Sequence, residues 1–337
     1  MKTIQVGIIG TGGMGARHAR NLAEYVAGAE VAAVMDIDHA RAEAVAAAFG
    51  GAKVFTDGLD LIRDAAVDAV VIVSPDPTHS ALAIACLVAG KPVLCEKPLA
   101  TNLADAEEVL RVEMAKGRRL VQVGLMREFD PAHRTVKDVI EKGEIGRPLF
   151  FRGLHTNLGS GFERTIEDVI INSAIHDIHS ARWFIEDEVE SVYVQPIAAN
   201  PQHPESCRFA LIQMTFKNGS LGVIEMNADA GYGYEVIVEV VGERGSARTT
   251  GLQSAVIRRS GTRSQTVEPD WLVRFDTAYI KEVQAWVRSL QEGKPVGANT
   301  WDGYMSLLIA DACVQSAKTG QPQTLPVMER PALYERS

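Results

Sequence analysis

The amino-acid sequence predicts an α/β fold that begins with a doubly wound parallel sheet. Up to about residue 123, short apolar runs alternate with helical patterns. The apolar runs are IQVGIIG, VAAVMD, AVVIVSP, PVLCEK and LVQVG. Runs that are apolar throughout fit strands buried on both faces, as in a parallel sheet. The repeated strand–helix order at this spacing is typical of doubly wound folds.

The first predicted strand ends in a glycine-rich turn, GTGGMG, which opens a helical segment. Such glycines allow a tight turn, a close approach of the backbone to a pyrophosphate, and close helix–strand packing, while the helix N-terminus faces the anion. A glycine-rich turn without a ligand is the alternative, but here strand, turn and helix are in register. We therefore predict a dinucleotide-binding Rossmann domain. The residues of the turn expected to contact the cofactor are Gly10, Gly12, Gly13, Met14 and Gly15.

Asp36 ends the next strand and predicts the type of cofactor. A carboxylate at this position accepts hydrogen bonds from the ribose hydroxyls and repels a 2′-phosphate. His39 and Arg41 lie nearby and could still tolerate that phosphate. The sequence therefore favours NAD, with NADP as the less favoured alternative.

Two further groups of polar residues follow later strands of the first domain. Ser74 and Pro75 end one strand, and His79 lies in the helix that follows. Glu96 and Lys97 end the next strand, before a proline. Ligands bind beyond the carboxyl ends of strands in open α/β sheets, so we expect all five residues to contact the cofactor. The alternative for Glu96 and Lys97 is a surface ion pair that ends the strand.

With these motifs the chain resembles the glucose–fructose oxidoreductase/inositol dehydrogenase (Gfo/Idh/MocA) family. The resemblance rests on GIIGTGGMG, EKPLA, VGLMREFDPAH and IHDIHSARW, and is greatest to the inositol 2-dehydrogenases. It implies a C-terminal α/β domain with a large, mostly antiparallel sheet, which often forms the interfaces of homotetramers or dimers. It also implies the oxidation of secondary alcohols of sugars or cyclic polyols with a nicotinamide cofactor and without a metal.

The resemblance assigns the catalytic pair to Lys97 and His176. As hydride leaves the carbinol carbon, an imidazole such as His176 can take the hydroxyl proton. Lys97 can hydrogen-bond the same oxygen and stabilise its developing charge. A regular helix from Asn172 to His179 would put Asn172, His176 and His179 on one face. A metal bound by the two histidines is disfavoured, because no further Cys or His lies at a spacing that completes the ligand set.

The helix departs from the family pattern at two positions. The family's inositol enzymes usually carry aspartates where this chain has Asn172 and His179. The amide of Asn172 can orient a substrate hydroxyl but supplies no negative charge. We expect the absence of that carboxylate to favour deprotonation of Lys97 and His176. The resemblance also places four residues in the substrate pocket, together with Lys97, Asn172 and His176: Arg127, His155, Asn157 and Tyr234.

The two predicted domains are residues 1–123, for the dinucleotide, and residues 124–337, for substrate and oligomerisation. In the second, β-rich runs are separated by turn signals at KNGS (217–220) and GERGS (242–246). Two helices, at about 275–292 and 300–319, close the chain, and these C-terminal helices could pack back on the first domain.

Composition excludes several other classes. The net charge of −9 and the pI of about 5.5 argue against nucleic-acid and anionic-membrane partners. The four cysteines form no CxxC pair and are expected to be buried thiols. No signal peptide or membrane span is recognisable, so we expect a cytoplasmic enzyme. The expected function is NAD-dependent oxidation of a cyclic polyol, myo-inositol or a relative. The alternatives are an oxidoreductase of a pyranose or anhydrosugar, and a nicotinamide-binding sensor without turnover.

Overall fold

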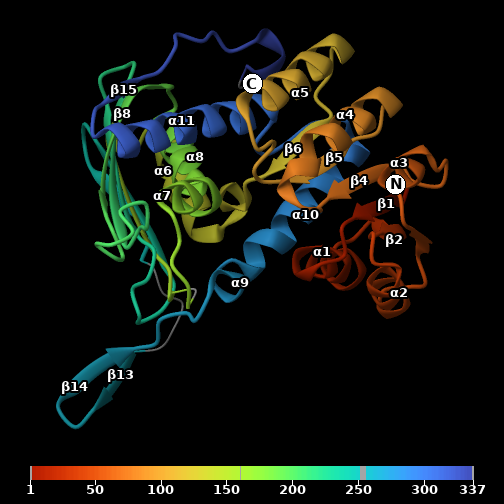
Figure 1. The fold of residues 1–337 in the computed structure, drawn as a ribbon, viewed down its shortest axis with the longest axis horizontal. Coiled ribbons are helices and arrows are strands. Elements are labelled where there is room, and N and C mark those ends of the chain that lie inside the picture. The colour runs from red at the N-terminus through yellow and green to blue at the C-terminus, as the bar shows by residue number, and fades with distance from the viewer. Residues whose placement is uncertain (1, 160, 251–255, 336–337) are drawn as a thin grey trace. The chain divides into compact units, whose positions relative to one another are not determined.

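The computed structural model describes residues 2–159, 161–250 and 256–335. The chain forms two compact units, which we describe separately (Figure 1). The first unit contains residues 1–129, 277–307 and 329–337, and the second contains residues 130–276 and 308–328. The domain boundary expected after residue 123 stays a prediction.

The first unit is built on a sheet of six parallel strands in the order β3-β2-β1-β4-β5-β6. The predicted doubly wound sheet is therefore confirmed. Every residue of β4, β5 and β6 is buried, as the unbroken apolar runs indicated. The short edge strand β3 was missed, because its three residues are exposed or half-buried and carry no apolar run. The strands are β1 (Ile4–Ile9), β2 (Ala29–Met35), β3 (Lys53–Phe55), β4 (Ala69–Ile72), β5 (Val93–Glu96) and β6 (Val121–Gly124).

Helices cover this sheet, and this unit also receives two helical segments from the far end of the sequence. In α10, Val283, Trp286 and Val287 join the same buried cluster as Val6 and Ile8 of β1. The expectation that C-terminal residues could pack on the first domain is confirmed for this helix. The helices are α1 (Gly13–Glu24), α2 (His39–Ala48), α3 (Gly58–Arg63), α4 (His79–Ala89), α5 (Leu103–Lys116), α10 (Asp276–Glu292) and α11 (Thr300–Thr319). Helix α11 belongs to the first unit up to Leu307 and to the second from Leu308.

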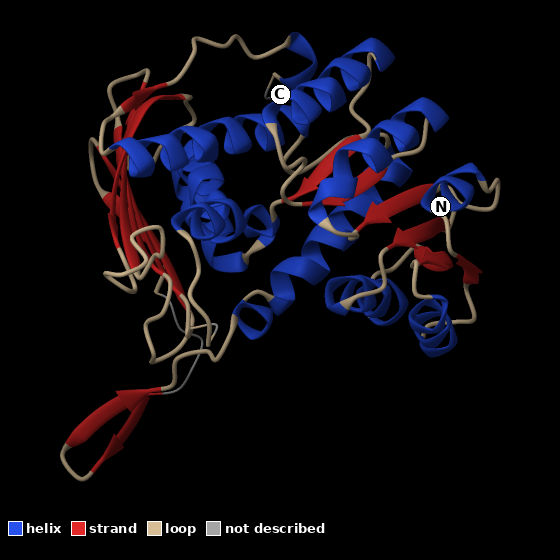
Figure 2. Ribbon diagram, in the orientation of Figure 1, coloured by secondary structure: helices blue, strands red, loops and turns tan. Residues whose placement is uncertain are grey.

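The second unit contains a mixed, mostly antiparallel sheet of seven strands in the order β12-β11-β7-β10-β9-β8-β15 (Figure 2). Only the β7–β10 pair is parallel. The turns predicted at 217–220 and 242–246 connect β9 to β10 and β11 to β12 and are confirmed. The strands are β7 (Pro148–Thr156), β8 (Val189–Ile197), β9 (Phe209–Phe216), β10 (Leu221–Asn227), β11 (Glu235–Gly242), β12 (Ser246–Arg248) and β15 (Gln323–Thr324).

Helix α8 (Ile175–Ile185) packs against β7 and β10, and all of its residues are buried. The helix does not begin at Asn172 as expected. A π-helical turn, Ile170–Ala174, separates it from the short helix α7 (Ile166–Val169). The prediction of one regular helix from Asn172 to His179 was therefore wrong, because the period of 3.6 residues does not hold across a π turn. The second unit also contains α6 (Pro131–Glu141), α9 (Trp271–Arg274) and the part of α11 from Leu308.

A separate two-stranded hairpin extends from the second unit (Figure 1). Strands β13 (Val256–Arg259) and β14 (Thr262–Gln265) pair antiparallel, and all of their residues are exposed. The two residues between them, Ser260 and Gly261, have φ values of 49° and 75°. Positive φ at both positions is the geometry of the type I′ turn, which matches the twist of a hairpin.

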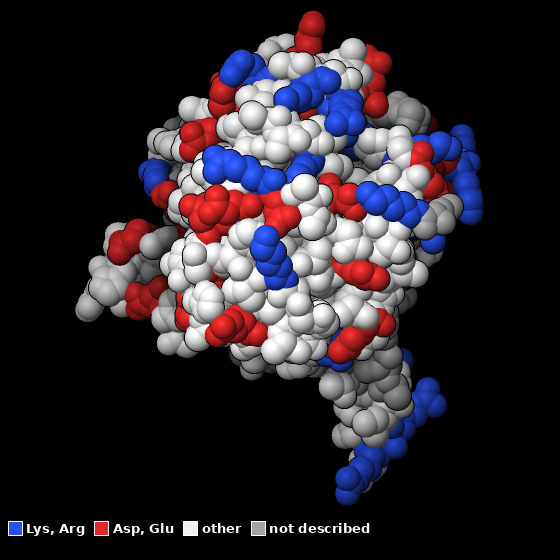
Figure 3. All heavy atoms as spheres, turned by 90° about the vertical axis from the view of Figure 1, so that its right-hand side faces the viewer, with Lys and Arg blue, Asp and Glu red and all other residues white. Residues whose placement is uncertain are grey.

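Cysteine burial and surface charge agree with the composition. All four cysteines are buried thiols, as expected. Basic and acidic side chains lie interspersed on the face drawn in Figure 3. Among the residues that the structure describes, no helix is long and apolar enough to cross a membrane.

Candidate active site

The glycine-rich turn connects β1 to α1, and each glycine of the GxGxxG pattern meets a different steric requirement. Gly10 has a φ of 95°, which favours glycine, and an added Cβ would lie 2.5 Å from the Val73 carbonyl oxygen. A Cβ on Gly15 would lie 1.9 Å from the Gly10 carbonyl oxygen, so the helix approaches the strand too closely for any side chain. A Cβ on Gly12 would meet nothing within 4 Å. The open side of the turn is therefore at Gly12, where the backbone is accessible to a pyrophosphate.

Asp36 is held at the end of β2 by the same turn. Its carboxylate accepts hydrogen bonds from the backbone N–H and the hydroxyl of Thr11, both at 2.9 Å, and from the backbone N–H of Asp38 at 3.0 Å. Burial alone would raise the pKa of Asp36, but these hydrogen bonds and the charge of Arg41 lower it below its ordinary value. Asp36 is thus an ionised acceptor at the position that was predicted to favour NAD over NADP.

Glu96 is buried at the end of β5 and does not lie on the surface. It accepts a hydrogen bond from Nε2 of His18 at 2.8 Å. Burial alone would raise the pKa of Glu96, but this hydrogen bond and the charges of His18 and Lys97 lower it. Lys97 itself is half-buried at the carboxyl end of β5. The lysine therefore stands beside an anchored, charged carboxylate.

His79 connects the two strand ends that were predicted to contact the cofactor. Its Nε2 lies 2.8 Å from the Ser74 carbonyl oxygen, and its Nδ1 lies 2.7 Å from that of Pro98. Both ring nitrogens are thus engaged by main-chain oxygens, and the ring is buried. We interpret His79 as fixing the loops at Ser74–Pro75 and Lys97–Pro98, and a contact between its ring and the cofactor stays a prediction.

In the second unit the structure brings His155 and Tyr234 together. Their rings contact edge to face with centroids 5.4 Å apart. Nδ1 of His155 lies 2.7 Å from Oδ2 of Asp177, in α8, and both side chains are buried. Asn157 follows β7, and its buried Nδ2 has no hydrogen-bond partner among the described residues. Two of the pocket residues named from the sequence, His155 and Tyr234, are therefore neighbours. His155 also pairs with the carboxylate of Asp177, to which the sequence had assigned no role in the pocket.

His176 and His179 are both buried, with 8% and 1% of their surfaces exposed, whereas Asn172 is exposed. Nδ2 of Asn172 donates to Oδ1 of Asp168 at 2.5 Å. Asp168, one turn earlier in the chain, thus places a carboxylate beside the amide of Asn172. The expected effect of Asn172 on the protonation of Lys97 and His176 stays a prediction. No three His, Cys, Asp or Glu side chains of the described residues are grouped as a metal site.

Arg127 lies in a 3₁₀ turn of the first unit, Met126–Phe129, and is almost fully buried. Its contact with substrate stays a prediction.

Asp130, in the second unit, accepts hydrogen bonds from His133 Nδ1 at 2.6 Å and from Arg274 at 2.8 Å. Burial would raise the pKa of Asp130, but these two partners hold it well below its ordinary value. Asp130 thus stabilises the start of α6.

Comparison with known proteins agrees with this geometry. The model of the oxidoreductase family's NAD-binding Rossmann fold, Gfo/Idh/MocA, matches residues 4–125, and the model of its C-terminal alpha/beta domain matches residues 137–326.

The chain belongs to the Gfo/Idh/MocA family.

Individual relatives within the family cover nearly the whole chain. An inositol 2-dehydrogenase of Rubrobacter xylanophilus is 50% identical over 335 residues, which are 99% of this chain and 96% of that protein. Among solved structures, myo-inositol dehydrogenase from Lactobacillus casei in complex with NAD(H) and myo-inositol has a TM-score of 0.94. It is 34% identical and the match covers 99% of this chain and 100% of that chain. Scyllo-inositol dehydrogenase from Lactobacillus casei, with bound NAD(H) and scyllo-inositol, has a TM-score of 0.87 and is 25% identical. The match covers 96% of this chain and 99% of that chain.

Sequence reasoning missed several residues that the fold places at these family motifs. His18 pairs with Glu96, and Asp177 with His155, but neither had been given a role beyond its helix. The sequence offered a weak signal for His18, which follows the last glycine of the turn by three residues. Glu282 of α10 had no signal at all. Its carboxyl group is fully buried, with no partner for either oxygen among the described residues.

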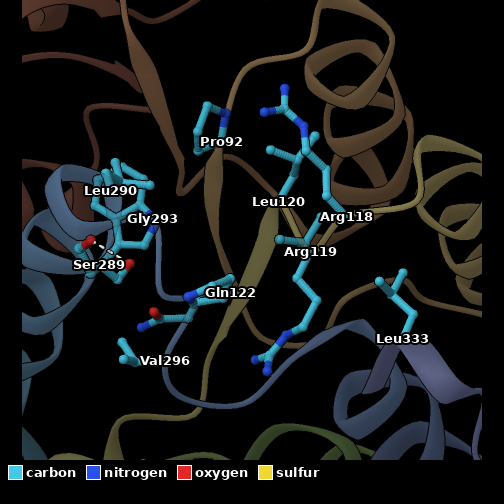
Figure 4. Close-up of a pocket in the computed structure, with 13 residues that line it drawn as sticks. Pro92, Arg118, Arg119, Leu120, Gln122, Ser289, Leu290, Gly293, Val296 and Leu333 are labelled. Carbon is cyan, nitrogen blue, oxygen red and sulfur yellow. Dashed lines mark hydrogen bonds between the residues drawn. The ribbon is translucent and has the colours of Figure 1, made fainter. Parts of the chain in front are cut away.

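A separate depression of about 390 Å³ lies in the first unit at the amino-terminal ends of β5 and β6. Figure 4 shows Ser289 and Leu290 of α10 on one side and Arg118 and Arg119 on the other. In a parallel sheet this edge is opposite to the one that carries the glycine-rich turn and Lys97. The depression is therefore separate from the predicted cofactor site.

Proposed function

We propose that this chain is an NAD-dependent dehydrogenase that oxidises a secondary hydroxyl of a cyclic polyol, myo-inositol or a related inositol, to the ketone. The observation that carries the proposal is the TM-score of 0.94, over 99% of this chain, with an enzyme that holds NAD(H) and myo-inositol. The relatives named inositol 2-dehydrogenase support the same reaction.

We further propose that the residues named from the sequence bind the cofactor in two groups. The turn at Gly10–Gly15 receives the pyrophosphate, because Gly12 leaves its backbone accessible. Asp36 accepts hydrogen bonds from the ribose hydroxyls, and its ionised state disfavours a 2′-phosphate. Ser74, Pro75 and the Glu96–Lys97 segment border the nicotinamide end of the site. When bound, NAD accepts the hydride from the carbinol carbon.

Lys97 and His176 carry the proton chemistry in this proposal. His176 accepts the hydroxyl proton, and Lys97 donates a hydrogen bond to the same oxygen as negative charge develops on it. The ammonium form of Lys97, which stands beside the charged carboxylate of Glu96, is the form that can donate a hydrogen bond to the alkoxide.

The pair His155–Asp177 presents a defined imidazole to substrate. A carboxylate only accepts hydrogen bonds, so Asp177 requires a proton on Nδ1 of His155. In the neutral imidazole Nε2 is then the acceptor, and it can bind a polyol hydroxyl. We propose that Arg127, Asn157 and Tyr234 supply further contacts to the hydroxyl groups, whose absence from a substrate would leave buried polar groups unpaired.

The remaining proposals concern the whole molecule. We propose that residues 1–123 form the dinucleotide-binding part and residues 124–337 the substrate-binding and oligomerisation part. We also propose a homo-oligomer, tetramer or dimer, in the cytoplasm. The net charge of −9 supports small-molecule partners over nucleic acids.

The decisive experiment follows absorbance at 340 nm with NAD and a panel of inositol isomers, pyranoses and anhydrosugars. We expect NADH formation with one or more inositols. Turnover of pyranoses or anhydrosugars alone would replace the proposal by a sugar oxidoreductase. NAD binding without turnover of any compound would indicate a sensor.

A variant set tests the assigned roles. We expect Lys97→Ala and His176→Ala to keep the NADH affinity of the wild type but to lose at least about 100-fold in kcat/KM, the lower end of the contribution of a general acid or base. Wild-type turnover in Lys97→Ala would exclude the role of this lysine.

A further inference from the structure

Asn172 is oriented by a partner that only accepts hydrogen bonds. Its Nδ2 donates to Oδ1 of Asp168 at 2.5 Å. An amide has two donors at nitrogen and an acceptor at oxygen, whereas a carboxylate has acceptors only. The NH₂ end of Asn172 must therefore face Asp168, and its carbonyl oxygen faces away from that carboxylate.

Asp168 is in turn held by Arg164. Its Oδ2 accepts from Nε of Arg164 at 2.5 Å, and its backbone carbonyl accepts from Nη2 of the same guanidinium at 3.2 Å. Nη1 of Arg164 donates to the hydroxyl of Ser173 at 3.1 Å, next to Asn172. The arginine side chain is only 14% exposed. This chain of contacts compensates the charge of Asp168 and restricts the rotation of its carboxylate.

The three side chains border open space. A depression of about 480 Å³ is lined by residues on α7, on the preceding loop and on the π-helical turn: Phe162, Glu163, Arg164, Thr165, Asp168 and Asn172. Its volume lies within the range of small-molecule sites. The residues that flank the π turn directly, Val169 and Ile175, are buried, whereas Asn172 within the turn is exposed at this depression. Turns of this kind are frequent at functional sites.

We propose that Asp168 is a positioning residue that fixes the amide of Asn172, so that the carbonyl oxygen of Asn172 accepts a hydrogen bond from a hydroxyl of the polyol. This inference rests on the proposed function. The negative charge stays on Asp168, paired with Arg164, and the group offered to the substrate is a neutral acceptor. The residue pair thereby selects an uncharged ligand whose hydroxyl donates at this point.

A double-mutant cycle with Asp168→Asn and Asn172→Ala tests the coupling. An amide at position 168 can donate as well as accept, so Asn172 is no longer held in one orientation. We expect Asp168→Asn to raise KM for the inositol about tenfold, with kcat and the KM for NAD within about twofold, as for the loss of uniform binding. Asn172→Ala should have at least the same effect. The double variant should be no worse than Asn172→Ala alone.

A matched control separates this role from a general loss of structure. Asp138→Asn breaks another ion pair of the i, i+4 type, between Asp138 and Arg134 at 2.6 Å in α6. It should leave every kinetic constant within about twofold of the wild type. A fall of similar size in both Asp variants, or a further tenfold loss from Asp168→Asn in the Asn172→Ala background, would overturn the inference.

A charge swap provides the rescue. Asn172→Asp alone places two carboxylates side by side, which should raise the KM for the polyol. Asp168→Asn combined with Asn172→Asp restores one carboxylate and one amide, with the carboxylate now at position 172. This double variant should recover the KM for the polyol to within about threefold of the wild-type value. Failure of the swap to improve on Asn172→Asp would contradict the positioning role. Polyol affinity of the enzyme–NADH complex, measured by calorimetry, gives the same comparison without turnover. Wild-type protein that neither binds nor oxidises an inositol would instead refute the proposed function, and this inference with it.

Discussion

Alanine substitutions at Gly15 and Gly12 of the β1–α1 turn should affect different properties: Gly15→Ala the stability of the protein, and Gly12→Ala its affinity for NADH. In Gly15→Ala the new Cβ would lie 1.9 Å from the Gly10 carbonyl oxygen, whereas such contacts are essentially never below 3.0 Å. Helix α1 and β1 would have to separate locally by about 1.1 Å. In Gly12→Ala the Cβ meets nothing within 4 Å, and the φ of −64° suits alanine.

The expected magnitudes follow from this difference. Overpacking costs about 1–3 kcal/mol, and for a domain of this size each kcal/mol lowers Tm by about 2–4 °C. We therefore expect Gly15→Ala to lower Tm by roughly 2–12 °C. Gly12→Ala should leave the Tm of the free protein within about 1–2 °C, because the same overpacking arises only against the pyrophosphate. A penalty of about 1–3 kcal/mol there weakens NADH binding about 5- to 150-fold.

Thermal melts without cofactor and NADH fluorescence titrations measure the two effects. Gly13→Ala is the control for the helix start in the thermal melts only, since a Cβ there also meets nothing within 4 Å and alanine favours a helix. A Gly15→Ala protein as stable as the wild type would refute the close packing of α1 on β1. Unchanged NADH affinity in Gly12→Ala would show that the pyrophosphate does not lie on this part of the turn.

Three further predictions concern single side chains. The hydroxyl of Tyr334 donates a hydrogen bond to the buried carboxylate of Glu113 at 2.6 Å, and Tyr334→Phe removes this bond. The substitution should lower the free energy of unfolding by about 1.5–3 kcal/mol in denaturant titrations. A change below about 0.5 kcal/mol would exclude that bond as a stabilising contact. Burial, with the charges of Glu96 and Glu128, raises the pKa of Glu282 well above its ordinary value. The contribution of Glu282 to stability is therefore present below pH about 4.3 and is lost as pH rises towards the folded-state pKa. The Tm advantage of Glu282→Gln should grow from pH 4 to pH 8, and a constant Tm difference would contradict this. Asp36→Ala should raise the ratio of kcat/KM with NADP to kcat/KM with NAD by about tenfold or more. An unchanged ratio would show that Asp36 does not interact with the adenosine ribose of the cofactor.

Sequence analysis identified the elements that local patterns encode, and it failed where a feature depends on its neighbours. The glycine-rich turn and Asp36 were located because their spacing reflects the geometry of one strand, one turn and one helix. Strand β3 was missed because an edge strand needs no apolar run. The π turn before α8 was missed because helical periodicity does not reveal an inserted turn. The family resemblance assigned Lys97 and His176, which composition and spacing alone left open.

The sequence by itself thus determined the alternation of strands and helices in the first unit apart from β3, and it located the turn and the acidic residue that are predicted to contact the dinucleotide. Only the tertiary structure decided which polar groups meet. His18 and Glu96 are 78 residues apart, and His155 and Asp177 are 22 apart, yet each pair forms one buried contact. Helix α10 returns to the first unit from beyond residue 275 and brings Glu282 with it. The physical reason is that backbone preference and hydrophobic periodicity act over a few residues, whereas the pairing of buried polar side chains is set by packing between segments that are distant along the chain.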